Sequence, residues 1–282
     1  MVLTFPCYIK EKVKEELYHS KNTMPLEPWQ WKHTNHPGIL RKSASCLTIL
    51  GVVTLGKLWG KLANSVLVVN TEDLQKKILH REKGVPLVTV SNHLSCVDDP
   101  VLLGNFSFKS FLFPSRVRWL PGASDIAFMK NSHVWFFTLG QIVPIVRGDG
   151  VYQPSMDFII DKVNDGGWVH FFPEGKVNMT KEFLRLKWGI GRVIAESKIN
   201  PLVVPYWHIG MDHILPNYPP YIPRVGKKVT MLIGDAMDFK EMLAQMRNEK
   251  RSPMEMRKQI TDAIQEELGR LKARTEALHY DR

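Results

Sequence analysis

The sequence predicts a mixed α/β fold in which a mostly parallel sheet is flanked by helices. From about residue 71 onward, short apolar runs of strand length alternate with segments of helical periodicity, as in repeated strand–helix units. The runs do not alternate strictly between apolar and polar residues, which is typical of strands covered on both faces. Hydrophobic residues make up 44% of the 282 residues, enough for a packed core. The expected strands are Val85–Val90, Gln141–Val146, Trp168–Phe172, Pro201–His208 and Lys228–Gly234.

Four parts are expected along the chain. Residues 1–36 form an N-terminal extension, 37–70 a membrane-interface anchor segment, 71–240 the main α/β domain, and 241–282 C-terminal helices packed on that domain. Within the extension, Ile9–Tyr18 could form a short helix. The extension lacks the arrangement of a secretory signal, and its glutamates and absence of arginine make it a poor mitochondrial presequence.

The anchor segment contains the apolar run Ala44–Gly56, followed by Lys57, Trp59 and Lys61. The run is 13 residues long, whereas a spanning helix needs roughly 20. Extending the run to Val69 reaches that length but takes in both lysines. We therefore expect a helix that lies in the membrane interface, with its lysines among headgroups and its tryptophan at the boundary. A buried amphipathic helix is the alternative.

Helices are expected between and after the strands. One begins with Pro100–Asn105, a second covers Ser155–Asn164 and ends at an Asp-Gly-Gly turn, and a third covers Lys181–Lys198. The segment His213–Gly226 is rich in proline and should be irregular. Two terminal helices are expected over residues 238–248 and 252–278.

Charge and cysteine content restrict the partners. With 38 Lys and Arg against 28 Asp and Glu, the net charge is +10, which favours nucleic acid, anionic lipid headgroups or phosphorylated substrates. No zinc spacing, aromatic RNA-binding signature or basic helix arm indicates nucleic acid, and the eight tryptophans favour a membrane surface. Cys7, Cys46 and Cys96 are too few for a disulfide framework. Neither they nor the ten scattered histidines have metal-ligand spacing, so no metal site is expected.

The segment Val90–Pro100 places His93 five residues before Asp98, directly after the first expected strand. A neutral imidazole can take a proton from a hydroxyl if a carboxylate fixes its tautomer and stabilises the resulting cation. Five residues would separate the two on a straight helix, but at a strand-to-helix turn they can face each other. Asp99-Pro100 supports such a turn, because Asp suits an N-cap and Pro the first helical position. A loop histidine beside an N-capping aspartate is the alternative.

A second constellation, Phe171–Lys176, follows another expected strand. Gly175 would let the backbone approach a ligand, and the free amides of the turn, together with Lys176, could hold a phosphate. Glu174 cannot bind phosphate directly, but it could orient a hydroxyl, hold a basic side chain or fix the turn. An ordinary β-turn would have the same residues.

Two further candidates, Arg147 and His208, also follow or end strands. Arg147 lies beside two glycines and could bind a phosphate with its bidentate fork; pairing with Asp149 or another surface acid is the alternative. His208 could line a site, although a structural role fits it better. His93, Arg147, Glu174 and His208 all lie at the carboxyl ends of expected strands, where open α/β sheets bind ligands. The four could therefore line one cleft.

These motifs resemble those of the glycerolipid acyltransferases. Asn92–Asp98 matches the His-x4-Asp signature of that superfamily, and Phe172–Gly175 matches its second well-known motif. Arg147 falls where the family places a phosphate-contacting arginine, and Val204-Pro205 where it has a further apolar-Pro motif. Over roughly residues 45–275 the sequence resembles one group of that superfamily more closely, the phospholipid–lysophospholipid transacylases. The segments that carry this closer resemblance are Asp149–Gln153, Asp165–His170, Phe172–Asn178 and Leu186–Arg192.

The resemblance implies an acyltransferase on a mitochondrial membrane interface. It implies transfer of a fatty acyl chain from a phospholipid such as phosphatidylcholine to a lysophospholipid, notably monolysocardiolipin, which gives cardiolipin without acyl-CoA or a bound cofactor. His93 would be the general base towards the lysolipid hydroxyl, and Asp98 would orient it. The residues expected around the substrate phosphate are Arg147, Glu174, Gly175 and Lys176, and those that could line the site are Asn92, Ser95, Cys96 and His208.

Three alternatives remain open from the sequence. The first is an acyl-CoA-dependent lysophospholipid acyltransferase, which needs the same attack on an acyl carbonyl. The second is a membrane lipid-binding protein without chemistry, although binding alone needs no base–carboxylate pair. The third is an acyl-enzyme formed on Ser95 or Cys96, both of which are close to His93 in sequence. The sequence leaves open whether the protein forms an oligomer.

Overall fold

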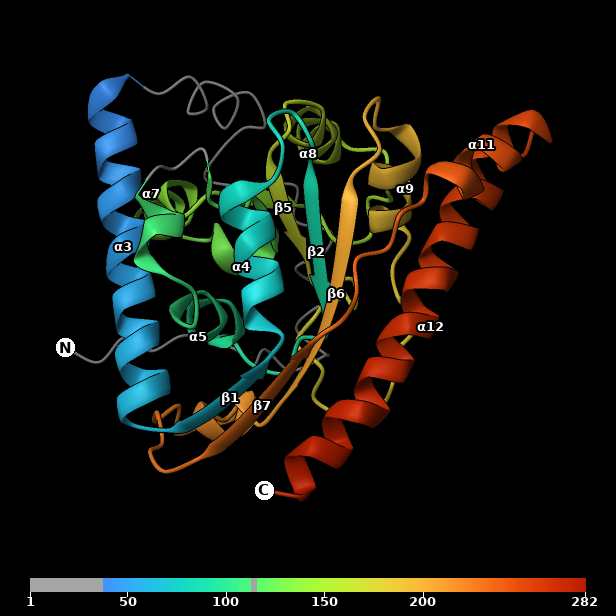
Figure 1. The fold of residues 1–282 in the computed structure, drawn as a ribbon. Helices are drawn as coiled ribbons and strands as arrows, with labels where there is room; N and C mark the ends of the chain where they lie inside the picture. Colours follow the sequence, from blue (N-terminus) through green and yellow to red (C-terminus); the bar gives the residue numbers. More distant parts are fainter. Residues whose placement is uncertain (1–37, 113–115) are drawn as a thin grey trace.

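The computed structural model describes residues 38–112 and 116–282, so the predictions for residues 1–36 lie outside the described residues. The core of the fold is a five-stranded sheet whose strands have the order β1-β7-β6-β2-β5 (Figure 1). Neighbouring strands are parallel except for β6 and β7. Its strands are β1 (Ser65–Val69), β2 (Leu87–Ser91), β5 (Trp168–Phe171), β6 (Leu202–Ile209) and β7 (Lys228–Ile233). The mixed, mostly parallel sheet predicted from the sequence is confirmed.

A smaller sheet continues the first one beyond β5. Its two strands, β3 (Leu120–Ala123) and β4 (Ile142–Ile145), are parallel. Trp119, just before β3, forms a bridge with Val169 of β5 and donates a 2.8 Å hydrogen bond to the carbonyl of Trp168. All five expected strands are present, whereas β1 and β3 were not predicted. β3 reads Leu-Pro-Gly-Ala, which has little strand propensity, and β1 follows the anchor helix so closely that its apolar residues extend the anchor pattern.

Helices cover both faces of the large sheet. Ile159 and Ile264 belong to the hydrophobic core on one face, and Val53 and Leu102 to the core on the other. Figure 1 shows α3 and α12 on opposite sides of the sheet, and β2 between them is buried at every residue, as expected for a strand covered twice. The helices are α3 (Ile39–Leu62), α4 (Thr71–His80), α5 (Asp98–Gly104), η1 (Phe108–Phe111), α6 (Ser124–Ala127), α7 (Asn131–Leu139), α8 (Pro154–Asn164), α9 (Gly189–Glu196), α10 (Met211–Ile214), α11 (Lys240–Asn248) and α12 (Pro253–Tyr280).

Two expected helix boundaries were wrong. The helix expected over Lys181–Lys198 begins only at Gly189, because the preceding backbone is held outside a helix: Leu186 donates to the side chain of Gln265 in α12, and Lys187 donates to the carbonyl of Pro173. Asp99 is also not an N-cap. The helix α5 already begins at Asp98, and Asp99 pairs with the buried Arg118 instead.

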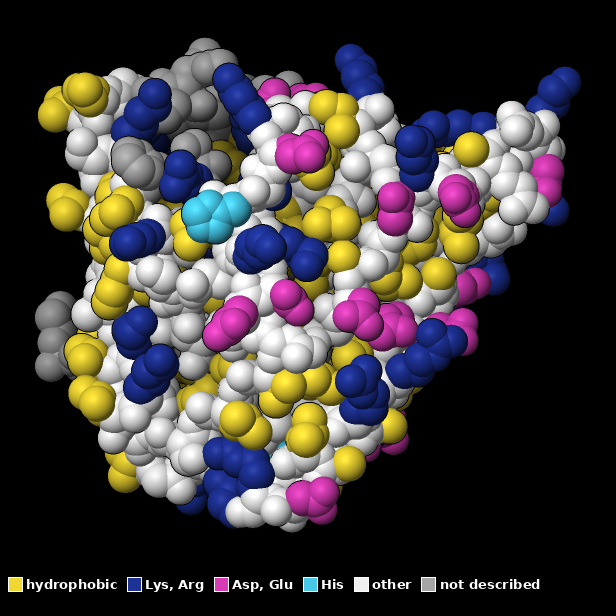
Figure 2. All heavy atoms as spheres, viewed as in Figure 1, with side chains coloured by type: hydrophobic (Ala, Val, Ile, Leu, Met, Phe, Trp, Pro, Cys, Tyr) yellow, Lys and Arg dark blue, Asp and Glu magenta, His cyan; other side chains and the backbone are white. Residues whose placement is uncertain are grey.

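The N-terminal helix α3 lies along the α/β domain instead of standing apart from it. A Cβ atom at Gly56 would lie 2.0 Å from the carbonyl oxygen of Pro100, and one at Gly104 would lie 2.4 Å from the amide of Lys57, so α3 and α5 touch backbone to backbone. The outer side of α3 is exposed and apolar, and Figure 2 shows hydrophobic side chains along this edge of the molecule. With 24 residues, and a mean hydropathy of 1.4 over an 18-residue window, α3 is long and apolar enough to interact with a membrane. The alternative of a buried amphipathic helix does not fit this apolar outer face.

Candidate active site

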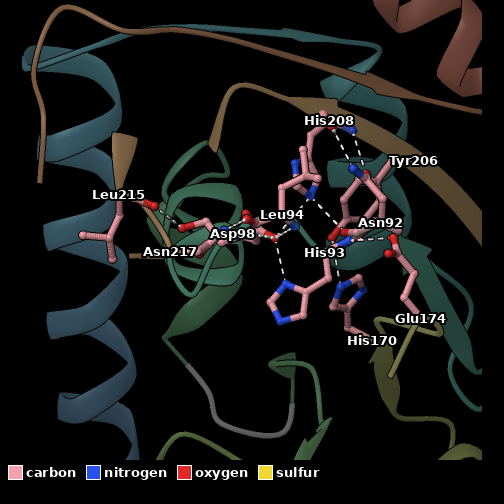
Figure 3. A network of polar contacts seen from close by, with 12 residues as sticks. Asn92, His93, Leu94, Asp98, His170, Glu174, Tyr206, His208, Leu215 and Asn217 are labelled. Carbon is pink, nitrogen blue, oxygen red and sulfur yellow. Dashed lines mark hydrogen bonds and ion pairs between the residues drawn. The ribbon is translucent and has the colours of Figure 1, made fainter. Parts of the chain in front are cut away.

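His93 and Asp98 face each other across the turn between β2 and α5 (Figure 3). The imidazole Nδ1 lies 2.8 Å from Oδ2 of Asp98, and because a carboxylate only accepts, Nδ1–H is the donor. Oδ2 also accepts the amide hydrogens of Leu94, at 2.6 Å, and Ser95, at 3.0 Å. The contact expected from the five-residue spacing is therefore present, and the backbone of the turn itself fixes the carboxylate. This leaves Nε2 of His93, whose side chain is 20% exposed, as the ring nitrogen that can take a proton.

The segment Pro173–Asn178 after β5 holds the backbone of His93 through both its amide and its carbonyl. Oε1 of Glu174 accepts the backbone amide hydrogen of His93 at 3.1 Å, and the carbonyl of His93 accepts the amide hydrogen of Asn178 at 2.7 Å. Glu174 is buried, and this burial, partly offset by the His93 amide, raises the pKa of its carboxyl to about 7. The sequence left three roles open for Glu174. The geometry matches the third, in which Glu174 fixes a turn, and the turn that it fixes is the one that carries His93.

Phe172, which the sequence did not single out, packs against the ring of His93. The imidazole stacks on Phe172, with ring centroids 4.1 Å apart and planes 13° apart. The edge of Phe172 meets His170 at 4.5 Å. His170 is fixed in turn, because Nδ1 contacts the hydroxyl of Thr89 at 2.9 Å and Nε2 contacts that of Tyr206 at 3.1 Å. Burial lowers the pKa of His170 well below its usual value, so it stays neutral. Phe172 was visible in the sequence only as the residue before Pro-Glu-Gly.

Asn92 and His208 lie behind the pair, where both are buried. The Asn92 side chain donates to the carbonyl of His208 at 2.9 Å and accepts its amide hydrogen at 3.0 Å, while Nε2 of His208 donates to the carbonyl of Asn92. Nε2 of His208 is also 3.6 Å from Oδ2 of Asp98, and burial lowers the pKa of the imidazole. The two residues thus link the end of β2 to β6, and His208 lies against the carboxylate of Asp98 on its buried side.

The two nucleophile candidates differ in exposure. Ser95 is completely buried, and its hydroxyl donates to the carbonyl of Leu215 at 2.9 Å. Cys96 is exposed and forms no disulfide. The serine hydroxyl thus holds the turn from a buried position, whereas the cysteine residue is exposed.

The expected phosphate residues lie on more open structure. Nε of Arg147, after β4, donates to Asp125 of α6 at 3.1 Å, and a terminal guanidinium nitrogen pairs with the other carboxylate oxygen. The sequence alternative of a surface acid is therefore present, but the acid is Asp125 and not Asp149. Both partners are at least one-third exposed. Gly175 has a φ of 73°, which a glycine adopts readily, and Lys176 beside it is exposed.

The arrangement can perform base catalysis. His93 has one nitrogen fixed on a buried carboxylate and the other facing outward, which is the geometry of a general base for a hydroxyl. Among residues 38–112 and 116–282, no group of three His, Cys, Asp or Glu side chains is placed to hold a metal ion.

Comparison with known proteins places the chain among acyltransferases. The family model described as Acyltransferase matches residues 65–209. The chain is 42% identical over 254 residues to the tafazzin of Drosophila melanogaster, covering 90% of this chain and 67% of that protein. It is 39% identical over 199 residues to a protein of Dictyostelium discoideum named taffazin, covering 68% of each. It is also 36% identical over 217 residues to an N-acylphosphatidylethanolamine synthase of Arabidopsis thaliana, covering 75% of each.

A solved structure has the same fold. The crystal structure of the 1-acyl-sn-glycerophosphate acyltransferase PlsC from Thermotoga maritima matches with a TM-score of 0.55 and covers 86% of each chain. At 18% identity this likeness concerns the fold alone. The acyltransferase fold that the sequence indicated is confirmed, and the relatives named tafazzin and taffazin confirm its closer resemblance.

Proposed function

This chain belongs to the tafazzin family of acyltransferases, and from that membership we propose that it moves a fatty acyl chain from a phospholipid directly to a lysophospholipid, without acyl-CoA. The observation that carries the proposal is the His93–Asp98 pair, whose free imidazole nitrogen faces outward from a buried, hydrogen-bonded carboxylate. Monolysocardiolipin is the proposed acceptor, phosphatidylcholine the proposed donor and a mitochondrial membrane the proposed location. The two phosphates of cardiolipin suit a chain of net charge +10.

The proposed reaction needs one proton carrier. Nε2 of His93 takes the proton of the lysolipid hydroxyl while that oxygen attacks the ester carbonyl carbon of the donor. The tetrahedral intermediate then collapses, the bond to the donor glycerol oxygen breaks, and that oxygen receives the proton from Nε2. No co-reactant is consumed, because one ester is formed for each one broken.

Three neighbours of His93 support this proton transfer. The carboxylate of Asp98 has a fixed orientation, because the oxygen that accepts from Nδ1 also accepts two backbone amide hydrogens. The face of Phe172 lies against the imidazole and stabilises its cationic form, as aromatic faces do for cations. Glu174 holds the backbone of His93 itself. An amide of the exposed turn at Lys176 is a candidate donor to the oxyanion, since the amide of Gly175 already donates to Phe172.

The proposed headgroup contacts are Arg147 and Lys176. The guanidinium fork of Arg147 already holds a carboxylate, that of Asp125, in the bidentate manner that also suits a phosphate. A bound phosphate would share or replace that carboxylate. Because the pair is partly exposed, the exchange costs little: such pairs contribute about 0–1 kcal/mol.

Direct transfer is proposed over an acyl-enzyme. A nucleophilic serine needs an approachable hydroxyl next to its base. The hydroxyl of Ser95 is instead buried and donates to Leu215, which argues against it. Cys96 is exposed and is the more accessible of the two. A protein that only binds lipid would gain nothing from a buried carboxylate fixed on an outward-facing imidazole.

An interfacial position of α3 is proposed for the membrane contact. The helix is packed against the domain from Ser45, whose hydroxyl donates to the carbonyl of Leu139, to Gly60, where a Cβ atom would lie 3.4 Å from Val101. A spanning α3 would carry these contacts, and the domain with them, into the hydrocarbon. Lying flat, α3 keeps the domain in water and its exposed leucines in lipid.

A second candidate function uses an amine as acceptor. It is favoured by the similarity to an N-acylphosphatidylethanolamine synthase over 75% of this chain. The same His93 could take a proton from an ammonium or amine group of a headgroup. The difference lies in the acceptor alone, so a product analysis separates the two.

The deciding experiment supplies purified full-length protein with acyl-labelled phosphatidylcholine and monolysocardiolipin in mixed vesicles, with and without CoA. We expect label in cardiolipin and no stimulation by CoA. In a parallel assay with labelled acyl-CoA as the donor, we expect no transfer. Transfer from acyl-CoA only would establish the CoA-dependent alternative. Label in N-acylated phosphatidylethanolamine, when that lipid is added, would establish the amine acceptor. Binding without any transfer would leave a lipid-binding protein.

A further inference from the structure

A second apolar surface lies beside α3, on α6, α7 and the link between them. Val134 is the only residue of α7 that is buried, although the helix is largely apolar. Soluble proteins expose single large apolar residues commonly, but several together mark an interaction site. The large side chains of this α6–α7 surface, each at least 47% exposed, are Ile126, Met129, Trp135 and Phe136.

The α6–α7 surface is continuous with the outer face of α3. The guanidinium of Arg41 in α3 lies over the ring of Trp135, 5.9 Å from its centroid. The hydroxyl of Ser45 donates to the carbonyl of Leu139 at 2.6 Å, and Figure 1 draws α7 alongside α3. The exposed leucines of α3 recur on the helix side away from the domain; they are Leu40, Leu47, Leu55, Leu58 and Leu62.

Charge indicates what covers this surface. The segments α3 and α7 contain no acidic residue, and the one acid of α6, Asp125, is paired with Arg147. Lys42 and Lys130 are exposed beside the apolar residues, and Arg41 lies on Trp135. An apolar face with tryptophan and basic residues at its border fits the interface of a bilayer with anionic headgroups, where indole rings and cations concentrate. A neutral protein partner would not require this one-sided charge.

We propose that the α6–α7 surface is a second lipid contact, which with α3 seats the domain on an anionic phospholipid bilayer at two places. A single helix lying in the interface leaves the domain free to roll about the helix axis. A second contact off that axis fixes the rotation and brings the Arg147–Asp125 pair to the level of the headgroups. The inference rests on the interfacial position of α3 proposed above.

The test compares three double variants in vesicle flotation, with phosphatidylcholine vesicles containing phosphatidylglycerol. Trp135→Ser/Phe136→Ser should lower the partition coefficient on the order of tenfold, since two half-exposed aromatic side chains lose their burial in lipid. Leu47→Ser/Leu55→Ser in α3 should lower it by a similar factor. The matched control Met254→Ser/Tyr280→Ser removes two exposed side chains from α12, on the other side of the sheet, and should leave it unchanged.

A second measurement needs no destabilising change. Brominated phospholipids should quench the fluorescence of Trp135, so the quenched fraction should fall in Trp135→Phe. Unchanged flotation of Trp135→Ser/Phe136→Ser and unchanged quenching in Trp135→Phe would overturn the inference. Loss of a dimer in light scattering, with flotation intact, would instead assign the surface to a second copy of the chain. Transfer between lipids in detergent micelles should persist in Trp135→Ser/Phe136→Ser; its loss there would count against the proposed site and not against the surface.

Discussion

The two halves of the candidate site are built differently. The turn that carries His93 is fixed on every side: Asp98 accepts from the imidazole and from two amides, Glu174 and Asn178 hold the backbone, and Phe172 holds the ring. The loop that carries Arg147 is held near its base but leaves the guanidinium on a partly exposed carboxylate.

The difference teaches how each half can contribute. Proton transfer requires a base that is placed within tenths of an ångström, so a fixed turn suits the chemistry. Headgroup binding tolerates a side chain that exchanges one anion for another, and an exposed pair makes that exchange inexpensive. Substitutions in the first half should therefore change the rate of transfer, and those in the second should change the affinity for anionic lipid.

The largest effect is expected at the fixed half. His93→Ala should remove nearly all transfer, and Asp98→Asn should lower kcat on the order of 10²-fold or more, because the imidazole loses its tautomer and its counter-charge. Acyl transfer by purified variants measures this, with thermal melts to check the fold. His213→Ala, which removes an exposed histidine, is the control. Near-normal turnover of His93→Ala would disprove the general-base assignment.

At the open half, Arg147→Ala should raise KM for anionic lysolipids roughly 10- to 100-fold with little change in kcat, since a charge-assisted contact contributes about 1.5–3 kcal/mol. Arg147→Lys keeps the charge but loses the bidentate guanidinium, so its KM should lie between those of the wild type and Arg147→Ala. Arg224→Ala, at another exposed arginine, is the matched control. If the lysine variant is fully active, bidentate binding is not required; if KM is unchanged in Arg147→Ala, the residue does not hold the headgroup.

The buried carboxyl of Glu174 gives the fixed half a pH dependence of stability. Its pKa is raised to about 7 in the fold from a usual value of 4.5, so the folded state binds more protons than the unfolded state between these values. The resulting stabilisation is present at low pH and is lost as pH rises towards 7. Glu174→Gln keeps the acceptor for the His93 amide and removes the titration. Its free energy of unfolding relative to wild type should therefore rise between pH 5 and pH 8, by on the order of 2 kcal/mol. Urea melts at the two pH values measure this, and a constant difference would contradict it.

A smaller effect should appear when the open half loses its internal anion. Asp125→Asn removes the carboxylate that competes with lipid for the fork of Arg147 and should lower KM for anionic lysolipids roughly two- to fivefold, because exposed pairs contribute at most about 1 kcal/mol. Asp161→Asn, at an exposed acid of α8, makes the same charge change elsewhere. A raised KM in Asp125→Asn would show that the carboxylate positions the arginine instead of competing with lipid.

The smallest effect is expected at the exposed thiol. Cys96→Ala should retain nearly full transfer, and rapid quenching of the wild type should trap no acylated protein. Ser95→Ala should lose some stability, because its hydroxyl donates to Leu215, but should keep most of its activity. A trapped protein with the added mass of an acyl group, together with loss of turnover in Cys96→Ala, would establish an acyl-enzyme instead.

Much of the fold followed from local patterns, and the exceptions have physical causes. The five strands were recognised because each is largely buried and most of its residues are apolar. β3 was missed because its Pro-Gly sequence has little strand propensity and is held as a strand by pairing with β4. α7 was missed because its apolar residues are consecutive and form no helical stripe. The exposed apolar face of α7 is explained only by its position next to α3, with which it forms one continuous surface.

By itself, the sequence determined the His93–Asp98 contact. The two residues are five apart at a strand-to-helix turn, and the short covalent path leaves them few ways not to meet. Only the tertiary structure decided the rest of the site. Glu174 reaches the amide of His93 across 81 residues and His208 supports Asn92 across 116, because β5 and β6 both pair with β2. Arg147 meets Asp125, not the nearer Asp149, because β3 and β4 are neighbours. Such partners depend on the order of strands in the sheet, and residue types along the chain do not encode that order locally.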